Sequence, residues 1–486
     1  MARIAVIGAG MGAMATAARL AVAGHQVTVY ERGATYGGAV GRYEREGFGF
    51  DTGPGLLHLP AVYRDLFVKT GKRSLEDCVD MVQADPAVRH VLPEHRIDVT
   101  LQGASRGGVA AALDEAFGQG AGERWNAVLG RARDAWDATR RPLLEEPLRP
   151  DWQVLGNDPY PALRKSGLLR RRTPTLQEIA DRELGGALGD LLTGLVAEYG
   201  IDPRSAPGAA TILPYMEQTF GSWYVRGGMR ALATAVYERC LERKVSFVFG
   251  AEVREVLVRG GRAAGLLLAD GSEAAADSVV CGIDPAGLPA GSLPWPPDAV
   301  PARGGLQGTS RFTLFLALRG ARPEGTAHRT RLSSGGTSTP DLTVLRPDDP
   351  ATRPDDGHEA ITVQARCAPQ GVVDWTAPSM AEPYAERLLE AAAQVVPQLR
   401  ERLLWHEVRT PVDVEAATGA VGGSVPLPAL AGAGGRLLYP ANTTAVPGLY
   451  LAGGWAHPGG GLPHAGMTGA LVAGLIVEGA EFRGSQ

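Results

Sequence analysis

The first thirty residues contain the pattern that most constrains how this chain can fold. A short apolar run, 4–7, leads into a glycine-rich turn, and an alanine-rich stretch follows and ends at Gly24. A second apolar run, 26–30, is rich in β-branched residues. Apolar runs of this length are typical of buried strands, and a glycine after an alanine-rich stretch is a helix stop signal. The sequence therefore predicts a strand–turn–helix–strand unit against which later segments must pack.

The turn has the spacing of the dinucleotide-binding fingerprint, GxGxxG/A. Gly8 permits the tight turn, Gly10 lets the backbone approach a pyrophosphate, and Ala13 keeps the helix close to the strand. Met11 and Gly12 complete the turn, where amides at the start of the helix can hold phosphates. We therefore expect a bound dinucleotide at this turn.

An acidic residue supports the same interpretation. Glu31 ends the second strand, 23 positions after Gly8, and its carboxylate can accept hydrogen bonds from a ribose 2′-hydroxyl. With 65 glycines in the chain a lone GxG match would be weak, but strand, helix and acid together are specific. A secretory leader is the alternative, because Arg3 precedes an apolar stretch and 21–23 resemble a cleavage site. Arg19 and the glycine spacing argue against it.

Length and composition narrow the class of protein. A chain of 486 residues predicts two domains, and 44% hydrophobic with 21% charged residues is typical of a soluble globular protein. The net charge of −5 gives no electrostatic case for nucleic acid, and no apolar run reaches the roughly 20 residues of a membrane span. Four scattered cysteines, Cys78, Cys240, Cys281 and Cys367, predict neither a metal site nor a disulfide framework. We expect a cytoplasmic protein.

Further glycine-rich motifs give the chain a resemblance. They are 8–13 with Glu31, Gly37–Gly38, 50–54 (FDTGP), 223–229 (WYVRGGM), 448–454 and 457–463. In this order, at both ends and in the centre, they resemble the phytoene desaturase-type flavoproteins, which include carotenoid desaturases and isomerases and are distantly related to monoamine oxidases. The resemblance implies FAD as the cofactor and covers most of the chain.

The same resemblance implies an α/β fold with two domains. A Rossmann-type FAD-binding domain would comprise 1–75, 222–285 and 437–486, and a discontinuous α+β substrate-binding domain with a helical part would comprise 76–221 and 286–436. Residue patterns predict helices at 60–72, 122–139, 175–195, 227–243, 380–396 and 467–477. They predict strands at 245–249, 252–258, 263–269 and 278–281, joined as a meander, and at 312–318, 360–365 and 449–452.

FAD contacts are implied at several stretches beyond the fingerprint. They are Arg32, Gly38, Ala39, Val40, Gly53, Pro54, Gly55, Leu56, Val253, Gly453, Gly454, Gly461, Leu462, Pro463 and Met467. The backbone of Val253 would lie beside the adenine, and 461–463 would lie against the isoalloxazine ring. The family usually has an arginine after the double glycine, where it contacts the FAD diphosphate, but this chain has Ala39. Either Arg42 compensates or the cofactor is held with one charge fewer.

Candidate catalytic groups near the reaction face are polar residues that form no spacing signature. They are Glu198, Tyr199, Glu217, Arg226 and His464. His464 is the strongest candidate because it follows the predicted flavin loop, whereas His457 is expected to be a surface histidine. In this interpretation the flavin accepts a hydride and the protein supplies binding, orientation and exclusion of water.

Three functions are compatible with these motifs. The resemblance favours an FAD-dependent desaturase that dehydrogenates a long apolar polyene or isoprenoid by hydride transfer to the flavin. A redox-neutral isomerase, or a saturase that uses reduced FAD, is the second. The third is a non-catalytic, prenyl-binding escort-like protein. An amine oxidase is disfavoured because those relatives place a lysine near the flavin from the later half of the substrate domain, and no lysine follows Lys244.

Two interaction partners remain open at this stage. No second GxGxxG follows a strand, so we expect oxygen or a quinone, rather than a nicotinamide, to accept the electrons. A basic stretch at 164–172, interrupted by Leu168 and Leu169, is either a solvated face or an amphipathic contact with anionic lipid. The second alternative predicts a peripheral membrane protein.

Overall fold

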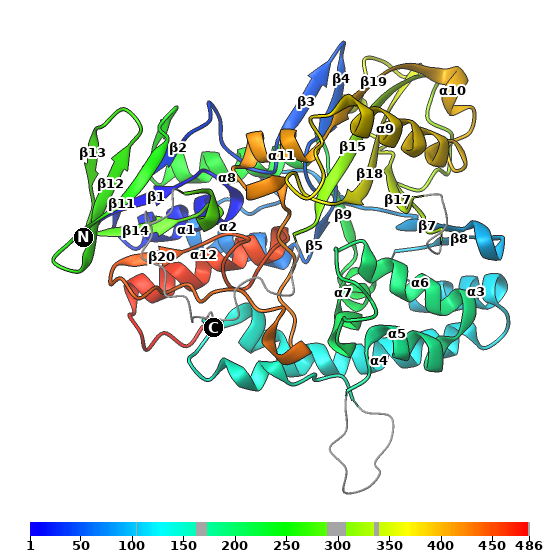
Figure 1. Ribbon diagram of the computed structural model, residues 1–486, viewed down its shortest axis with the longest axis horizontal. Coiled ribbons are helices and arrows are strands. Elements are labelled where there is room, and N and C mark those ends of the chain that lie inside the picture. Colours follow the sequence, from blue (N-terminus) through cyan, green and yellow to red (C-terminus); the bar gives the residue numbers. More distant parts are fainter. Residues whose placement is uncertain (104, 162–172, 289–307, 335–339, 485–486) are drawn as a thin grey trace, which may run out of the picture.

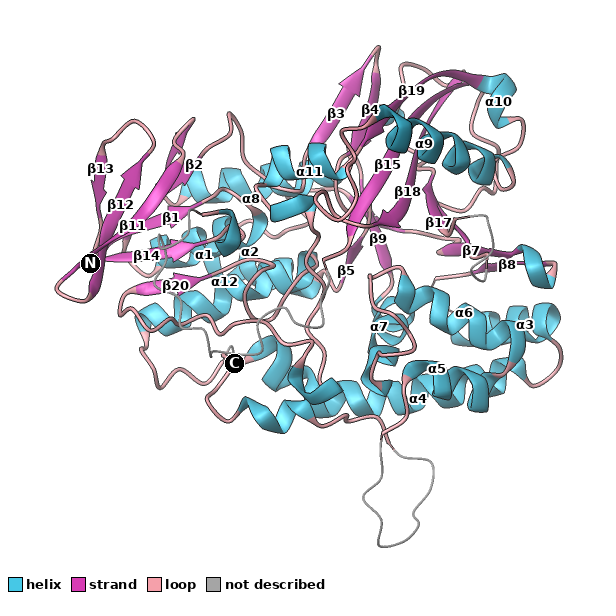
Figure 2. Cartoon of the chain, viewed as in Figure 1, coloured by secondary structure: helices cyan, strands magenta, loops and turns pink. Residues whose placement is uncertain are grey.

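Two parts with different architecture lie side by side in the computed structural model of this protein (Figure 1). One contains a parallel sheet with helices, and the other contains a mixed sheet above a group of helices, as the colouring of Figure 2 makes clear. The structure describes residues 1–103, 105–161, 173–288, 308–334 and 340–484. Within these ranges no helix is both long enough and apolar enough to cross a membrane.

The parallel sheet has the strand order β10-β2-β1-β14-β20. Its strands are β1 (Arg3–Ile7), β2 (Gln26–Glu31), β10 (Ser246–Phe249), β14 (Ser278–Cys281) and β20 (Leu449–Leu451). All four pairings are parallel, and β1 lies at the centre with both faces buried. Three separate segments of the chain therefore meet in this one sheet.

Different layers cover the two faces of the parallel sheet. Helices cover one face, namely α1 (Met11–Val22), α2 (Ala61–Thr70), α8 (Met229–Glu242) and α12 (Leu462–Val477). An antiparallel sheet covers the other face, formed by β11 (Val253–Arg259), β12 (Arg262–Leu268) and β13 (Glu273–Ala275). Small residues allow close approach, since a Cβ on Gly282 would lie 2.7 Å from the Cβ of Ala13.

A seven-stranded sheet forms the second part, with the order β19-β15-β18-β17-β16-β7-β8. Its strands are β7 (Val88–Leu92), β8 (Ile97–Leu101), β15 (Ser310–Arg319), β16 (Arg329–Leu332), β17 (Leu342–Leu345), β18 (His358–Cys367) and β19 (Leu403–Arg409). Alternate residues such as Phe312 and Leu314 pack with Leu388 of helix α9 (Pro378–Ala393). On the opposite face, Phe315 and Ala317 pack with Phe48 and Phe50, and the rest carries polar side chains that are described with the candidate site.

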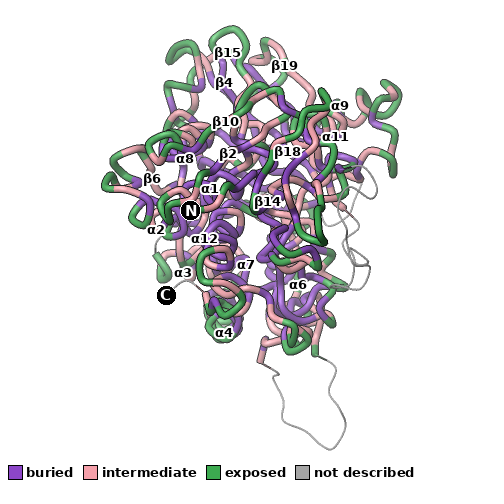
Figure 3. Tube along the Cα trace, turned by 90° about the vertical axis from the view of Figure 1, so that its left-hand side faces the viewer, coloured by how far each residue is buried: buried purple, intermediate pink, exposed green. Residues whose placement is uncertain are grey.

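The remaining helices of this part form a core of their own below the sheet (Figure 1). They are α3 (Arg106–Phe117), α4 (Ala121–Arg140), α5 (Leu176–Ile179), α6 (Gly186–Ala197) and α7 (Ile212–Phe220). Leu113, Trp125 and Leu192 are buried there, and Figure 3 shows buried segments through the interior with exposed segments at the periphery. Shorter elements are β3 (Arg42–Arg45), β4 (Phe48–Asp51), β5 (Leu57–His58), β6 (Met81–Gln83), β9 (Ser222–Val225), α10 (Leu399–Arg402) and α11 (Pro411–Thr418).

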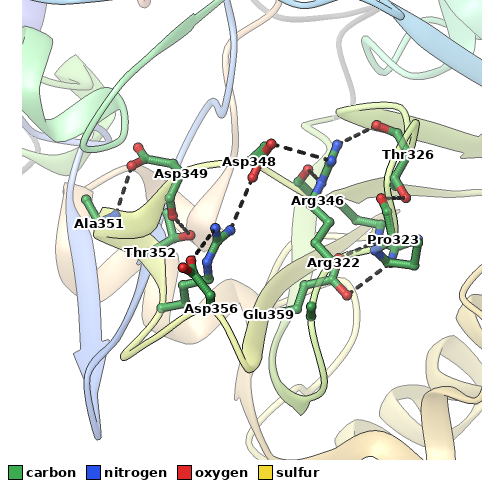
Figure 4. A network of polar contacts seen from close by, with 12 residues as sticks. Arg322, Pro323, Thr326, Arg346, Asp348, Asp349, Ala351, Thr352, Asp356 and Glu359 are labelled. Carbon is green, nitrogen blue, oxygen red and sulfur yellow. Dashed lines mark hydrogen bonds and ion pairs between the residues drawn. The ribbon is translucent and has the colours of Figure 1, made fainter.

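A polar network connects the turn after β9 to the loop between β17 and β18. The carboxylate of Asp349 accepts hydrogen bonds from the hydroxyl of Tyr224 at 2.8 Å and from the amide of Gly227 at 2.6 Å. It also accepts from the amide of Ala351 at 2.9 Å, as Figure 4 shows. The sequence motif 223–229 is thus fastened to the seven-stranded sheet.

The fold class is confirmed, but several predicted elements are corrected. The helix expected at 175–195 is interrupted, because Gly185 has a φ of +67° after a π-helical turn at 180–184, and α6 starts anew. The last helix begins at Leu462 rather than at Met467, because Pro463 occupies its first turn, where no amide donor is needed. The residue limits of the two domains stay a prediction.

The predicted meander is correct only in its centre. β11, β12 and β13 pair antiparallel, but β10 and β14 join the parallel sheet beside β2 and β1. Helix α8 precedes β10, and a helical crossover returns the chain parallel to the sheet, which a hairpin does not. The stretch 76–221, for which only helices were predicted, also contains β6, β7 and β8, whose polar residues mask the strand pattern.

Candidate active site

The glycine turn between β1 and α1 has the geometry that its sequence predicts. A Cβ on Gly8, whose φ is +85°, would lie 2.5 Å from the Cγ2 of Ile283, and a Cβ on Gly12 would lie 2.7 Å from the Cα of Gly453. By contrast, a Cβ on Gly10 would meet no heavy atom within 4 Å. Gly8 and Gly12 thus serve close packing, whereas Gly10 leaves an open approach to the backbone of the kind that a pyrophosphate requires.

Glu31 is held beside this turn by two backbone amides. One carboxylate oxygen accepts from Ala9 at 2.7 Å and the other from Gly33 at 2.7 Å. The carboxylate is therefore fixed at the carboxyl end of β2, where ligands of open parallel sheets bind. Arg32 points toward α11 rather than toward the glycine turn. Its guanidinium donates to the carbonyl oxygens of Glu415 at 3.1 Å and Ala416 at 2.5 Å.

The double glycine and the loop after β4 lie against the turn. A Cβ on Gly38 would come within 3.1 Å of the Cα of Gly10, and a Cβ on Gly53 would come within 2.2 Å of the carbonyl oxygen of Ala39. Gly38 and Ala39 are exposed, while Val40 is buried. Three of the predicted FAD-binding stretches are thus brought together in space.

Arg42 is occupied by the protein itself. Its guanidinium donates to the carbonyl oxygens of Gly227 and Ala351, each at 2.6 Å, and to the carboxylate of Glu44 at 2.6 Å. These contacts direct it toward the β17–β18 loop rather than toward the glycine turn. Of the two alternatives for Ala39, they favour a diphosphate held with one charge fewer.

Other predicted FAD residues lie in the loop after β20 and at the start of α12. Gly454 packs near Pro426, since its Cβ would lie 2.7 Å from the Cγ of that proline, and Gly461 is exposed at the start of α12. The carbonyl of Leu462 accepts from the hydroxyl of Tyr63 at 2.9 Å. The remaining positions are Pro54 and Gly55, which are not buried, and Leu56, Val253, Gly453, Pro463 and Met467, which are. Their contacts with FAD stay predictions.

His464 lies in the first turn of α12 and is buried. Burial lowers the pKa of its imidazole to about 4, with a smaller contribution from His457, so the ring is neutral at pH 7. Its Nδ1 atom is shielded from solvent and has no hydrogen-bond partner in the part of the chain that the structure describes. A buried polar atom without a partner is rare in proteins, and this one suits a contact with a ligand.

The expectation that His457 lies on the surface is wrong. The side chain is fully buried, and its Nε2 lies 2.9 Å from the carbonyl oxygen of Glu146. Burial lowers its pKa to about 4 as well. The stretch that follows β20 passes through the interior, where its backbone bonds to Asn442 at 2.8 Å, so a histidine in it cannot reach water.

Glu198 and Glu217 belong to one buried network on the polar face of the seven-stranded sheet. Arg329 pairs with Glu217 at 2.5 Å, and Arg331 pairs with Glu198. The hydroxyl of Tyr199 donates to Glu217 at 2.7 Å. Burial alone would raise the pKa of both carboxyls, but the neighbouring guanidinium groups hold the pKa of each below its usual value.

This electrostatic environment limits what the two carboxylates can do. Both remain ionised at neutral pH, so neither can donate a proton, and each holds an arginine in place. Arg226 does not join them, because it lies at the surface with its Nε 3.1 Å from a carboxylate oxygen of Asp80. The structure therefore brings Glu198, Tyr199 and Glu217 together but leaves Arg226 apart.

Sequence reasoning missed most of this network. The missed members are Arg311, Arg329, Arg331, Arg366, His58 and His90. Two arginines two positions apart in a short strand, as at Arg329 and Arg331, are the signal that could have found them, because alternate residues share one face. Among the described residues no group of acidic, histidine and cysteine side chains could hold a metal ion.

Comparison with known proteins identifies the family of this chain. The sequence profile of the family "Flavin containing amine oxidoreductase" matches residues 14–477. The chain belongs to this family. FAD is therefore its cofactor, and the protein is an FAD-dependent oxidoreductase, as the glycine turn, Glu31 and the double glycine predict.

Relatives in this flavoprotein family span the whole chain. A hydroxyneurosporene desaturase of Cereibacter sphaeroides is 30% identical over 503 residues, which cover 98% of this chain and 97% of that protein. A 4,4′-diapolycopene oxygenase of a Methylomonas species is 28% identical and covers 98% of both. The crystal structure of an oxidoreductase from Methanosarcina mazei shares the fold, with a TM-score of 0.65 at 18% identity over 96% of this chain and 98% of that one.

Proposed function

We propose that this flavoprotein desaturates a long apolar polyene or isoprenoid of the carotenoid type. The observation that carries the proposal is the similarity to a hydroxyneurosporene desaturase along nearly the full length of both chains. The neutral, buried imidazole of His464 supports it, because desaturation removes a proton as well as a hydride, and an uncharged ring nitrogen without a partner among the described residues can accept a proton.

The residues around the glycine turn fit FAD. Bound there, FAD would supply the acceptor for a hydride removed from the substrate. Gly10 and the first amides of α1 would hold the diphosphate, and Glu31 would bind the ribose through the carboxylate that its backbone contacts already orient. The exposed start of α12 at Gly461 would lie at the ring, with Leu462 and Pro463 excluding water.

The redox-neutral isomerase and the saturase are not favoured, because the similarity along nearly the full chain is to a desaturase. The escort-like alternative is not favoured, because the family match is to flavin-containing oxidoreductases along residues 14–477. We propose oxygen or a quinone as the final electron acceptor. Predicted domain limits of 1–75, 222–285 and 437–486 for the FAD part are part of the same proposal.

Anaerobic mixing separates these functions. We expect phytoene or neurosporene in detergent micelles to bleach the flavin of the purified yellow protein without added reductant, because the hydride removed from the substrate must reach the cofactor. An isomerase would need flavin that is reduced beforehand and would return it unchanged, and a saturase would oxidise reduced flavin. Product that forms only after reduction, with oxidised flavin untouched by substrate, would exclude the desaturase.

We also propose that the protein contacts a membrane surface. The basic stretch 164–172 lies outside the described residues, but the ends of α1, α2 and α8 form a second candidate, which we call the α2 patch. It combines exposed apolar and basic residues, namely Val22, Val68, Lys69, Lys72 and Arg73, with the half-buried Arg243, and Arg73 pairs with Glu242 there. Apolar side chains among basic ones suit the headgroup region of anionic lipid.

Sedimentation with phosphatidylserine-containing vesicles tests the α2 patch. Replacing Lys69 and Lys72 by Gln should weaken binding by about 1 kcal/mol per charge, since each basic residue is attracted to the negative surface. The exposed residue Arg259, on β11 far from the patch, provides the matched control as Arg259→Gln. Equal sedimentation of all three proteins would contradict the proposal.

A further inference from the structure

Two arginines on the polar part of the seven-stranded sheet, Arg311 and Arg366, have no carboxylate partner among the described residues. In the antiparallel pairing of β15 with β18, Arg311 lies opposite Arg366 and Thr313 lies opposite Gln364. Residues paired in this way project from the same face of a sheet. The two guanidinium groups therefore extend from neighbouring strands on the face opposite to the apolar residues that pack on α9.

The nearby acids are already engaged. Glu198 and Glu217 pair with the arginines of β16, and the Oδ1 of Asp341 accepts from the amide of Ser334 at 2.7 Å. Within the described residues no carboxylate lies within 4.0 Å of Arg311 or Arg366. Arg311 donates one long hydrogen bond, 3.3 Å, to the carbonyl oxygen of Glu198, and one Nη atom of Arg366 is buried without a partner there.

Two adjacent buried cations are unfavourable unless an anion joins them. Burial lowers the pKa of both guanidinium groups, and the charge of Arg311 lowers that of Arg366 further. Both residues are half-buried rather than fully enclosed. The arrangement suits the binding of one anionic group, because two neighbouring guanidinium groups can donate hydrogen bonds to the two oxygens of a carboxylate.

The arginine pair borders the predicted flavin stretches on two sides. Gln364, two residues before Arg366 on the same face, donates to the carbonyl oxygen of Gly53 at 3.3 Å. On the other side, Thr309 bridges to Val425, and the next residue, Pro426, packs against Gly454. A molecule held by the two arginines would therefore lie along the sheet toward the cofactor.

We propose that Arg311 and Arg366 bind a carboxylate at one end of the substrate. The inference rests on the proposed function and narrows it: the preferred substrate class is an apolar polyene or isoprenoid chain that ends in a carboxylic acid, rather than a pure hydrocarbon. The arginines position the chain and take no part in the transfer of the hydride.

Binding of a matched acid and alcohol tests this without knowledge of the natural substrate. All-trans-retinoic acid and all-trans-retinol are titrated into the FAD-loaded protein at pH 7.5, and quenching of tryptophan fluorescence is measured. We expect the acid to bind at least about 10-fold more tightly, because only a carboxylate can form charged hydrogen bonds with both arginines. Equal affinities for the two ligands would overturn the proposal even if every variant failed to fold.

Substitutions of Arg366 test whether the arginine pair causes the preference for the acid. Arg366→Gln should lose about 10-fold in affinity for retinoic acid and change little for retinol, and Arg366→Lys should retain part of the preference. Arg319→Gln is the control, because Arg319 is exposed at the far end of β15, the strand that carries Arg311. Retinoic acid should also raise the melting temperature of the wild type and of the control, but not that of Arg366→Gln. An equal loss of affinity for retinoic acid and retinol would mean that the two arginines only support the structure, and it would overturn the proposal.

The outcome is separable from that of the desaturase test. Preference for the acid, without bleaching of the flavin by any polyene under anaerobic conditions, would reject the proposed reaction but retain the carboxylate site. Bleaching by phytoene, together with equal binding of acid and alcohol, would retain the desaturase and reject the site.

Discussion

At the scale of single residues, Ala39 occupies the position where the family usually has an arginine, and the effect of this difference on FAD binding can be measured. Its side chain is exposed beside the glycine turn, and Arg42 is held by other groups. We expect Ala39→Arg to tighten FAD binding about 10-fold, since a charged hydrogen bond contributes about 1.5 to 3 kcal/mol. Reconstitution of the apoprotein with FAD measures this, and Ala34→Arg, also exposed in the same loop, is the control. Unchanged affinity would mean that backbone amides already neutralise the diphosphate.

His457 predicts a pH dependence of stability. Its pKa is about 4 when folded and about 6.5 when unfolded, so the unfolded chain binds the proton first as the pH falls. The free energy of unfolding should therefore decrease between pH 6.5 and pH 4, by up to about 1.4 kcal/mol per pH unit for this residue. Urea denaturation at several pH values measures this. Between pH 6.5 and pH 4 the free energy of unfolding should change less with pH for His457→Gln than for the wild type. His406→Gln, at an exposed position, should keep the wild-type slope.

At the scale of elements, the ion pair between Arg346 and Glu359 fastens β17 to β18. Its two hydrogen bonds, of 2.8 and 3.0 Å, are fully enclosed, and Arg402 joins the same carboxylate at 2.7 Å. Figure 4 shows the pair beside the Asp349 loop. Glu359→Gln should lower the free energy of unfolding by about 3 to 5 kcal/mol, because it leaves a buried guanidinium uncompensated. Chemical denaturation checks this, with the exposed pair member Glu386→Gln as control, and a loss below 1 kcal/mol would contradict it.

Elements with a clear period could be predicted from the sequence, and those that depend on distant partners could not. The helices at Ala121–Arg140 and Met229–Glu242 and the strand at Ser310–Arg319 follow their apolar patterns closely. The assignment of β10 and β14 to the parallel sheet depends on which strands they meet, which local pattern does not encode. Gly185 was one glycine among many, so the break it makes in a helix was not distinguishable beforehand.

At the scale of the whole molecule, the candidate site divides in the same way. Its cofactor side consists of short contiguous motifs whose chemistry is legible in sequence, such as the turn at Gly8 and Gly10. The proposed substrate side is assembled from side chains on different strands and helices, with Arg311, Arg331 and Glu198 far apart in the chain. Their meeting is a property of the tertiary fold, so sequence reasoning identified Glu198 but not the arginines that surround it.

The meeting of Gly12 with Gly453 has a consequence for biosynthesis. Strand β20 and the loop that touches the glycine turn leave the ribosome long after the turn itself, because most of the described chain lies between them. Until β20 has been synthesised, one edge of the parallel sheet stays uncovered. FAD would be captured only after β20 has joined the sheet, and a chaperone that shields the open edge until then would raise the yield of yellow protein.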